Sequence, residues 1–283
     1  MDELCTVCTK NSTLIVIAVL GNNHSKLHTK RLIIDFYFQG GEGIVTSNNS
    51  QPVLSCSAGF SAINARTLQK YLITSARCLP FNPENISIYH APWLPPYPHQ
   101  EAYDFFGVVR QFRYVGIDFA LIEKTNDDFK LNPMIRSSVD EYPSLMISRF
   151  NINGVPIPVG HHLCISGYES HTSCGEATIV DAHVSLQSLR PGIIGDTYRR
   201  MIRANIPSSN RDVGGTVFIN EIHNGTLYTL VLGILTSDLR KNRNSSGNVV
   251  IQQLWQIINF APAQDIFESL LYIDLNIYGQ LQQ

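Results

Sequence analysis

Cysteine and histidine are the residues of this chain that could hold a metal ion or carry redox chemistry. Cys5 and Cys8 form a C-x-x-C pair, which alone is half of a zinc site or a redox motif. No second pair at zinc spacing follows, and the βαβ pattern that accompanies the redox motif is absent from the sequence around it. His161, His162 and His171 lack a repeated ligand spacing. We therefore expect no metal site and no cofactor.

Three short stretches resemble motifs of one enzyme family. Thr74–Cys78 (TSARC) resembles the T-A-x-H-C motif of chymotrypsin-like serine proteases. Ile117–Ile122 (IDFALI) resembles the D-(I/F/Y)-A-L strand of the same family. Arg211–Phe218 (RDVGGTVF) resembles the family's nucleophile loop, G-D-S-G-G-P-V-F. The three occur in the family's own chain order. Gly40–Phe60 and Cys164–Gly175 also resemble the streptogrisin-like branch of that family, so the resemblance covers roughly residues 40 to 275.

The resemblance assigns the catalytic positions to residues that cannot perform the reaction. In this family a serine attacks the scissile carbonyl, a histidine takes its proton, and an aspartate orients the histidine. This chain has Val213 at the serine position, Arg77 at the histidine position and Asp118 at the aspartate position. Valine has no nucleophilic atom, and a guanidinium group stays protonated at ordinary pH and cannot act as a base. We therefore expect a catalytically inactive homologue.

The loop from Arg211 to Gly215 also supplies the family's oxyanion hole, through the backbone N–H groups of the nucleophile and of the glycine two residues before it. That glycine is Arg211 here, and a residue with a Cβ resists positive φ. Loss of one such donor costs about 10²- to 10³-fold in rate. Asp212, Gly214 and Gly215 match the family, so we expect the loop to keep its tight turn although the chemistry is lost.

The arginine at the histidine position suggests a replacement for the lost imidazole contact. In the family geometry Arg77 would point at Asp118, and a guanidinium group can bind a carboxylate. An unpaired carboxylate beside Ile117 and Phe119 would be costly to bury. We predict a salt bridge between Arg77 and Asp118, with an Arg77 side chain turned to solvent as the alternative.

Four cysteines match half-cystines of the family, and the resemblance implies the bridges Cys56–Cys78 and Cys164–Cys174. The family's third bridge is absent, because Ser209 occupies the place of its first half-cystine. Disulfides favour an oxidising compartment. Six N-x-S/T sequons agree with this, starting at Asn11, Asn23, Asn48, Asn85, Asn224 and Asn244, of which the last four are our glycosylation candidates. The protein is predicted to be secreted.

Residues 1–39 are expected to form an N-terminal extension, because the resemblance is lost before residue 40. Thr13–Leu20 (TLIVIAVL) and Arg31–Phe38 (RLIIDFYF) are predicted to be paired strands. The first is too short to span a bilayer, which needs about 20 residues, and no basic segment precedes it as in a signal peptide. We interpret the extension as a pro-segment remnant, with a defective signal region and a packed extension as alternatives.

Short runs rich in β-branched and aromatic residues predict strands through the middle of the chain: Leu68–Thr74, Phe105–Tyr114, Asp118–Glu123, Ala177–Leu186, Gly215–Asn220 and Leu227–Leu235. Their close spacing favours an all-β sandwich or barrel. The resemblance implies two six-stranded Greek-key β-barrels of the chymotrypsin type. It also implies a short helical turn at Ser75–Leu79 and a short C-terminal helix at Gln264–Tyr272.

We expect one protease-like domain over residues 40–283. Its first barrel would span about residues 40–125 and its second about residues 160–255. The segment Thr125–Val159 is predicted to be a turn-rich connection, because it contains Pro133, Pro143, Pro156 and Pro158. The active-site cleft of the family lies between the two barrels.

The formal net charge of −2 and the lack of a long basic run disfavour nucleic acid and polybasic membrane contact. No membrane span is expected. The partner we expect is a protein or peptide ligand in or near the cleft between the barrels. One alternative is an active trypsin-like endopeptidase with non-standard residues, drawn from Ser208, Ser209, His161, His162, His171, His183 and His223. The other is a decayed family copy without a binding role.

Overall fold

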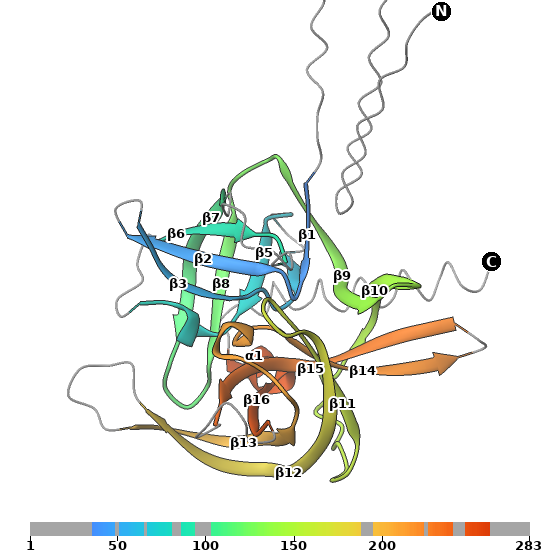
Figure 1. Cartoon of the computed structure of the whole chain (residues 1–283). Coiled ribbons are helices and arrows are strands. Elements are labelled where there is room, and N and C mark those ends of the chain that lie inside the picture. The colour runs from blue at the N-terminus through green and yellow to red at the C-terminus, as the bar shows by residue number, and fades with distance from the viewer. Residues whose placement is uncertain are drawn as a thin grey trace, which may run out of the picture. The chain divides into compact units, whose positions relative to one another are not determined.

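The computed structural model describes residues 36–48, 51–64, 67–80, 86–93, 103–187, 195–223, 226–239 and 247–260. Within these ranges the chain forms sixteen strands, two short 3₁₀ turns and one α-helix (Figure 1). The predictions that lie outside them are the strand Thr13–Leu20, residues 31–35 of the strand Arg31–Phe38, the pair Cys5 and Cys8, the helix Gln264–Tyr272, and the sequons at Asn11, Asn23, Asn85, Asn224 and Asn244.

The first sheet has the strand order β3-β2-β6-β7-β8-β5-β4, with every pair antiparallel. Its strands are β2 (Gly43–Asn48), β3 (Gln51–Ser57), β4 (Ser61–Ile63), β5 (Lys70–Thr74), β6 (Ser87–Ala91), β7 (Asp104–Arg113) and β8 (Phe119–Lys124). Only residues 58–60 separate the edge strands β3 and β4. In this bend the backbones of Gly59 and Phe60 bond to that of Ile73, with N···O distances of 2.9 Å. The bent β3–β4 segment therefore pairs with β2 at one end and β5 at the other, and closes a six-membered barrel.

The second sheet contains a closed ring of six strands. These are β11 (His162–Gly167), β12 (His171–Gln187), β13 (Gly195–Asn205), β14 (Thr216–His223), β15 (Thr226–Asp238) and β16 (Val249–Gln253). Their order is β15-β14-β11-β12-β13-β16, and β16 pairs back with β15. The predicted all-β architecture of two six-stranded barrels is confirmed, and each of the six strands predicted through the middle of the chain overlaps an observed one.

The prediction of a turn-rich connection over Thr125–Val159 is wrong for most of its length. The structure has a hairpin of β9 (Phe129–Val139) and β10 (Tyr142–Phe150) there. β9 pairs in parallel with β1 (Phe36–Gly40), and β10 pairs in parallel with β15, so the hairpin extends the second sheet. Pro133 and Pro143 lie at shifts in the pairing register. The sheet can accept proline there, because a residue at such a shift does not need an N–H to donate to the neighbouring strand.

The helix α1 (Leu254–Phe260) follows β16 directly and packs into the core. Leu254 and Ile257 are one turn apart and fully buried, in a cluster that also contains Phe60 of the first barrel and Phe218 of the second. One hydrophobic cluster thus joins both barrels and the helix. None of the helices in the described ranges has the length and apolar character needed to cross a bilayer.

Candidate active-site region

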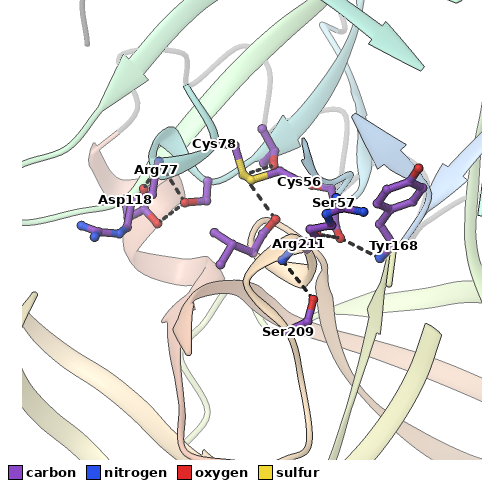
Figure 2. The surroundings of a disulfide bond; sticks show 11 residues. Cys56, Ser57, Arg77, Cys78, Asp118, Tyr168, Ser209 and Arg211 are labelled. Carbon is purple, nitrogen blue, oxygen red and sulfur yellow. Dashed lines mark hydrogen bonds between the residues drawn. A yellow bond between two sulfur atoms is a disulfide. The ribbon is translucent and has the colours of Figure 1, made fainter. Parts of the chain in front are cut away.

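Asp118 lies immediately before β8, and its side chain is fully buried. Its Oδ2 accepts a hydrogen bond from the Ser75 hydroxyl at 2.5 Å, and its Oδ1 accepts one from the backbone N–H of Arg77 at 3.3 Å (Figure 2). The N–H of Asp118 donates to Oε1 of Gln252 at 3.1 Å. Ser75 caps the 3₁₀ turn η1 (Ala76–Cys78), which confirms the predicted helical turn at Ser75–Leu79.

Burial dominates the electrostatics of Asp118. Removal from water raises the pKa of the carboxyl group to about 6, because a buried environment disfavours the charged form. The hydrogen bond from Ser75 and the positive charge of Arg77 both lower the pKa, but they only partly offset the burial. The carboxyl group of Asp118 therefore keeps its proton up to a higher pH than an ordinary aspartate does.

The predicted salt bridge between Arg77 and Asp118 is wrong. The guanidinium group of Arg77 instead donates from Nη2 to the backbone carbonyl of Gln187 at 3.0 Å, at the end of β12. The carboxylate of Asp118 is already bound by the Ser75 hydroxyl and by the backbone of Arg77 itself. Local hydrogen bonds therefore satisfy the aspartate, and the arginine side chain links the first barrel to the second.

The loop that resembles the nucleophile loop contains a second 3₁₀ turn, η2 (Asn210–Asp212), capped by Ser209. Asp212 is fully buried, and its carboxylate accepts hydrogen bonds from the N–H groups of Ser209 at 2.6 Å, Glu169 at 2.9 Å and Ser170 at 3.0 Å. Hydrogen bonds to an ionised acceptor are among the stronger ones in proteins. Asp212 therefore fixes the loop to the turn between β11 and β12.

Both backbone groups of Arg211 are already hydrogen-bonded within the protein. Its N–H donates to Oγ of Ser209 at 3.0 Å, and its carbonyl accepts from Oγ of Ser57 at 2.8 Å (Figure 2). Among the described residues, the non-glycine positions with positive φ are Leu68, His171, Asp181 and Arg200. Arg211 thus keeps the negative φ that a residue with a Cβ prefers, and its N–H is used inside its own turn.

Val213 directly follows η2 and is buried, with 9% of its surface exposed. It belongs to the hydrophobic cluster that contains Ala76, Cys78 and Leu79 of the first barrel. The backbone carbonyl of Val213 lies 3.2 Å from Sγ of Cys78, so the second-barrel loop meets the segment that carries Arg77. Burial of a valine of this kind stabilises a fold by roughly 1.5–3 kcal/mol.

The two glycines after Val213 are required by close packing. Gly214 has φ of +90°, and a Cβ there would lie 2.1 Å from Oγ1 of Thr74 and 2.4 Å from the carbonyl oxygen of Ser57. A Cβ on Gly215 would lie 2.3 Å from the carbonyl oxygen of Ser166. Only glycine fits both positions, so the tight turn of the loop depends on them.

Two disulfides brace this region. Cys56 of β3 is bonded to Cys78 of η1, and Cys164 of β11 is bonded to Cys174, its direct cross-strand partner on β12. Ser209, at the place that the resemblance gives to the first half-cystine of the family's third bridge, donates its hydroxyl to Oε2 of Glu169 at 2.5 Å. A hydrogen bond therefore joins the η2 loop to the β11–β12 turn.

The other candidate groups have structural partners or face solvent. The Ser208 hydroxyl donates to Oδ2 of Asp238 at 3.2 Å. His171 stacks on Trp93 with ring centroids 4.3 Å apart, and exposed positions are occupied by His161, His162 and His183. In the described ranges, His162 lies close enough to Cys164 and Cys174 to suggest a metal site, but both sulfur atoms are used by the disulfide.

Sequence reasoning missed Ser75 and Gln252, which hold the side chain and the backbone of Asp118. Ser75 had a local signal, because serine before a helical turn is a preferred N-cap. Gln252 had none, since it is 134 residues from Asp118 in the sequence. Contacts of that kind appear only when the barrels are assembled.

Comparison with known proteins identifies the fold. No protein-family model and no curated protein sequence matches the chain, but 276 chains of solved structures do. The chymotrypsin of Cellulomonas bogoriensis has a TM-score of 0.53 at 18% identity, over 79% of this chain and 95% of that one. The Nocardiopsis protease reaches 0.54 at 18% identity with the same coverage. A glutamic acid-specific serine protease reaches 0.54 at 17% identity, over 78% of this chain and 96% of that one. The chain has the chymotrypsin-like serine protease fold.

Proposed function

We propose that this protein is a catalytically inactive serine protease homologue that acts by binding a protein or peptide in or near the cleft between its barrels. The observation that carries the proposal is Val213. By resemblance it stands at the nucleophile position, it has no nucleophilic atom, and its side chain belongs to the hydrophobic cluster that includes Ala76 and Cys78. A hydrolase of this fold needs an attacking oxygen at that point.

Arg77 supports the proposal independently. By resemblance it stands at the base position, where a guanidinium group cannot accept a proton at ordinary pH. Its side chain is held by the carbonyl of Gln187, and Asp118 is bound by Ser75. The retained aspartate therefore has no imidazole to orient, and its remaining role is structural.

The loop of Arg211 weakens the case for residual catalysis. By resemblance its N–H is one of the two oxyanion donors, and here that N–H donates to Ser209 at 3.0 Å. Stabilisation of a transition-state oxyanion requires donors that are free and aimed at it. Asp212, Gly214 and Gly215 keep the loop folded, which supports a fold that outlasted its catalytic groups.

The same proposal includes secretion of the protein. It also includes one protease-like domain over residues 40–283 and an N-terminal extension over residues 1–39. The two disulfides favour an oxidising compartment. Glycan attachment at Asn48, Asn85, Asn224 and Asn244 would follow passage through a eukaryotic secretory pathway. A mass decrease on treatment of such material with peptide N-glycosidase would support this part, and an unchanged mass would contradict it.

Peptide binding in the cleft is tested by selection. A random peptide library is selected on the immobilised full chain, and the affinity of the selected peptides is then measured against two charge-reversal variants. Arg211→Glu alters the exposed face of the η2 loop, whereas Arg110→Glu alters an exposed position on β7. We expect only the first to weaken binding, by about tenfold or more. Equal effects of both variants, or no selectable peptide, would contradict a cleft-binding role.

A further inference from the structure

A pocket of about 430 Å³ is lined by the end of β7 and the segment after it, by strand β13 and by helix α1, and no residue of the η2 loop lines it. Its lining includes Arg113, Ile117, Thr197, Arg199, Arg200 and Trp255. Pockets that bind small molecules usually have volumes of about 300–1,000 Å³. The cavity is therefore large enough for a small ligand.

The charge of the pocket is one-sided. Three of its lining residues are arginines, and none is acidic. Within the ranges that the structure covers, no carboxylate pairs with the guanidinium groups of Arg199 or Arg200. The whole chain has a net charge of −2, so this concentration of positive charge is local. The guanidinium groups of Arg199 and Arg200 are like charges at one cavity, and a bound anion would attract both.

Arg200 has an unusual backbone conformation, and its side chain lies over the ring of Trp255 in the pocket lining. Its φ is +56°, a left-handed conformation that costs a residue with a Cβ of order 1–3 kcal/mol. Its guanidinium carbon lies 5.5 Å from the ring centre of Trp255, close enough for a cation–π contact. Gly154 packs against the same ring, where a Cβ would come within 3.0 Å. The indole is thus held in place and orders the guanidinium group.

The backbone beneath the arginines is held by a chain of glutamine hydrogen bonds. Gln256 donates to the carbonyl of Arg199 at 3.0 Å, and Gln253 donates to the carbonyl of Arg200. Gln252 donates to Gln256 at 2.6 Å and accepts from the N–H of Asp118 at 3.1 Å. The arginines therefore project from a braced wall, and a rigid support of this kind lowers the entropic cost of binding.

We propose that this pocket binds a small oxyanion with two or more negative charges, carried by phosphate or carboxylate groups. Guanidinium groups suit both, because their planar N–H donors match paired oxygens. The inference depends on the pocket alone and holds whether or not the cleft binds a peptide.

Isothermal titration calorimetry of the full chain with inorganic pyrophosphate and, separately, with citrate tests this proposal. We expect saturable binding of at least one probe at low ionic strength, weakening as salt is added. Binding of pyrophosphate alone would assign the site to phosphate groups, and binding of citrate alone to carboxylates. Arg199→Gln is expected to weaken the binding by about tenfold.

Arg110→Gln is the matched control. Arg110 lies on β7, as Arg113 does, but it is 52% exposed and pairs with Glu123 outside the pocket lining. The substitution removes the same charge and should change the affinity by less than about twofold. Near-UV circular dichroism of each variant reports whether it is folded. Failure of the natural chain to bind either probe, or equal losses in the two variants, would overturn the proposal.

Discussion

The hydroxyl of Ser75 donates to Oδ2 of Asp118 at 2.5 Å, and this contact fixes how the buried aspartate is used. In a triad, a carboxylate orients an imidazole. Here it is bound from within its own barrel, by Ser75 and by the N–H of Arg77. The arginine side chain is left to bond Gln187 of the second barrel. Asp118 thus acts as an anchor for η1.

The anchor predicts that Ser75→Ala destabilises the protein. The buried carboxylate would lose a hydroxyl donor and η1 would lose its cap, so the free energy of unfolding should fall by about 2 kcal/mol at pH 7.5. Ser185→Ala, at an exposed position of β12, is the control and should change it by less than about 0.5 kcal/mol. Urea unfolding measures both, and equal effects would argue against the anchor.

The pKa of Asp118 predicts a pH dependence of stability. Burial raises the pKa of this carboxyl group to about 6 in the folded state, against about 3.9 when unfolded. Between about pH 4 and 6 the folded state therefore keeps a proton that the unfolded state has released, so the unfolding free energy falls as pH rises. The full loss above pH 6 is roughly 3 kcal/mol for a shift of about two units.

Asp118→Asn removes this titration and isolates it from the rest of the protein. The stability of Asp118→Asn minus that of the natural chain should increase from pH 4 to pH 7, because only the natural chain has a carboxylate to ionise there. Denaturant unfolding at a series of pH values gives the difference. A difference that stays constant or decreases over this range would show that Asp118 is not buried as described.

The glycine after Val213 predicts a steric effect. Gly214→Ala forces a Cβ to within 2.1 Å of Oγ1 of Thr74 at φ of +90°, and should destabilise the protein by about 3 kcal/mol or more. Gly160→Ala is the control, since Gly160 has φ of +82° with nothing within 4 Å of a Cβ. It adds backbone strain alone and should cost about 1 kcal/mol. Thermal unfolding compares the two, and similar losses would contradict the close packing of the loop.

Removal of either disulfide is predicted to lower the free energy of unfolding, by a different amount for each bridge. Cys56→Ala with Cys78→Ala opens a loop with a sequence separation of 22, and Cys164→Ala with Cys174→Ala opens one of 10. The free energy of unfolding should fall by roughly 3 kcal/mol in both double variants. The fall should be about 0.7 kcal/mol larger in the first, because the unfolded chain gains more entropy when the longer loop is opened. Guanidinium unfolding under oxidising conditions tests the order, and a larger loss for the shorter loop would contradict it.

The parts of the fold that could be predicted from sequence are those with a local signal. The strand patterns of β5, β7, β8, β12, β14 and β15 are visible in their own residues, whereas the turn η1 was implied by the family resemblance. The hairpin of β9 and β10 was missed because Pro133 and Pro143 look like turn residues until the register shifts around them are known. α1 was missed because two buried residues, Leu254 and Ile257, carry too short a periodic pattern.

At the candidate site, residue identities were readable but their contacts were not. The resemblance located Arg77, Asp118 and Val213, yet the predicted salt bridge failed. The contact that Arg77 makes is with a carbonyl 110 residues away, on a strand of the other barrel. Ser75 binds Asp118 where a contact from the Arg77 side chain was predicted, and Ser75 lies two residues before Arg77 in the sequence. The Ser75 hydroxyl binds the Asp118 carboxylate, while the Arg77 guanidinium group binds Gln187. The spacing of these residues in the sequence does not reveal which of the two groups binds Asp118.

Labelling of the full chain with a fluorophosphonate probe, which reacts with activated serines, tests the central claim of inactivity most directly. The positive control restores the family residues by Arg77→His, Arg211→Gly and Val213→Ser, with Ser75→Ala to free Oδ2 of Asp118. We predict that the natural chain stays unlabelled while the restored variant is labelled. Stoichiometric labelling of the natural chain would contradict the account, and mapping the modified serine would identify an unrecognised nucleophile.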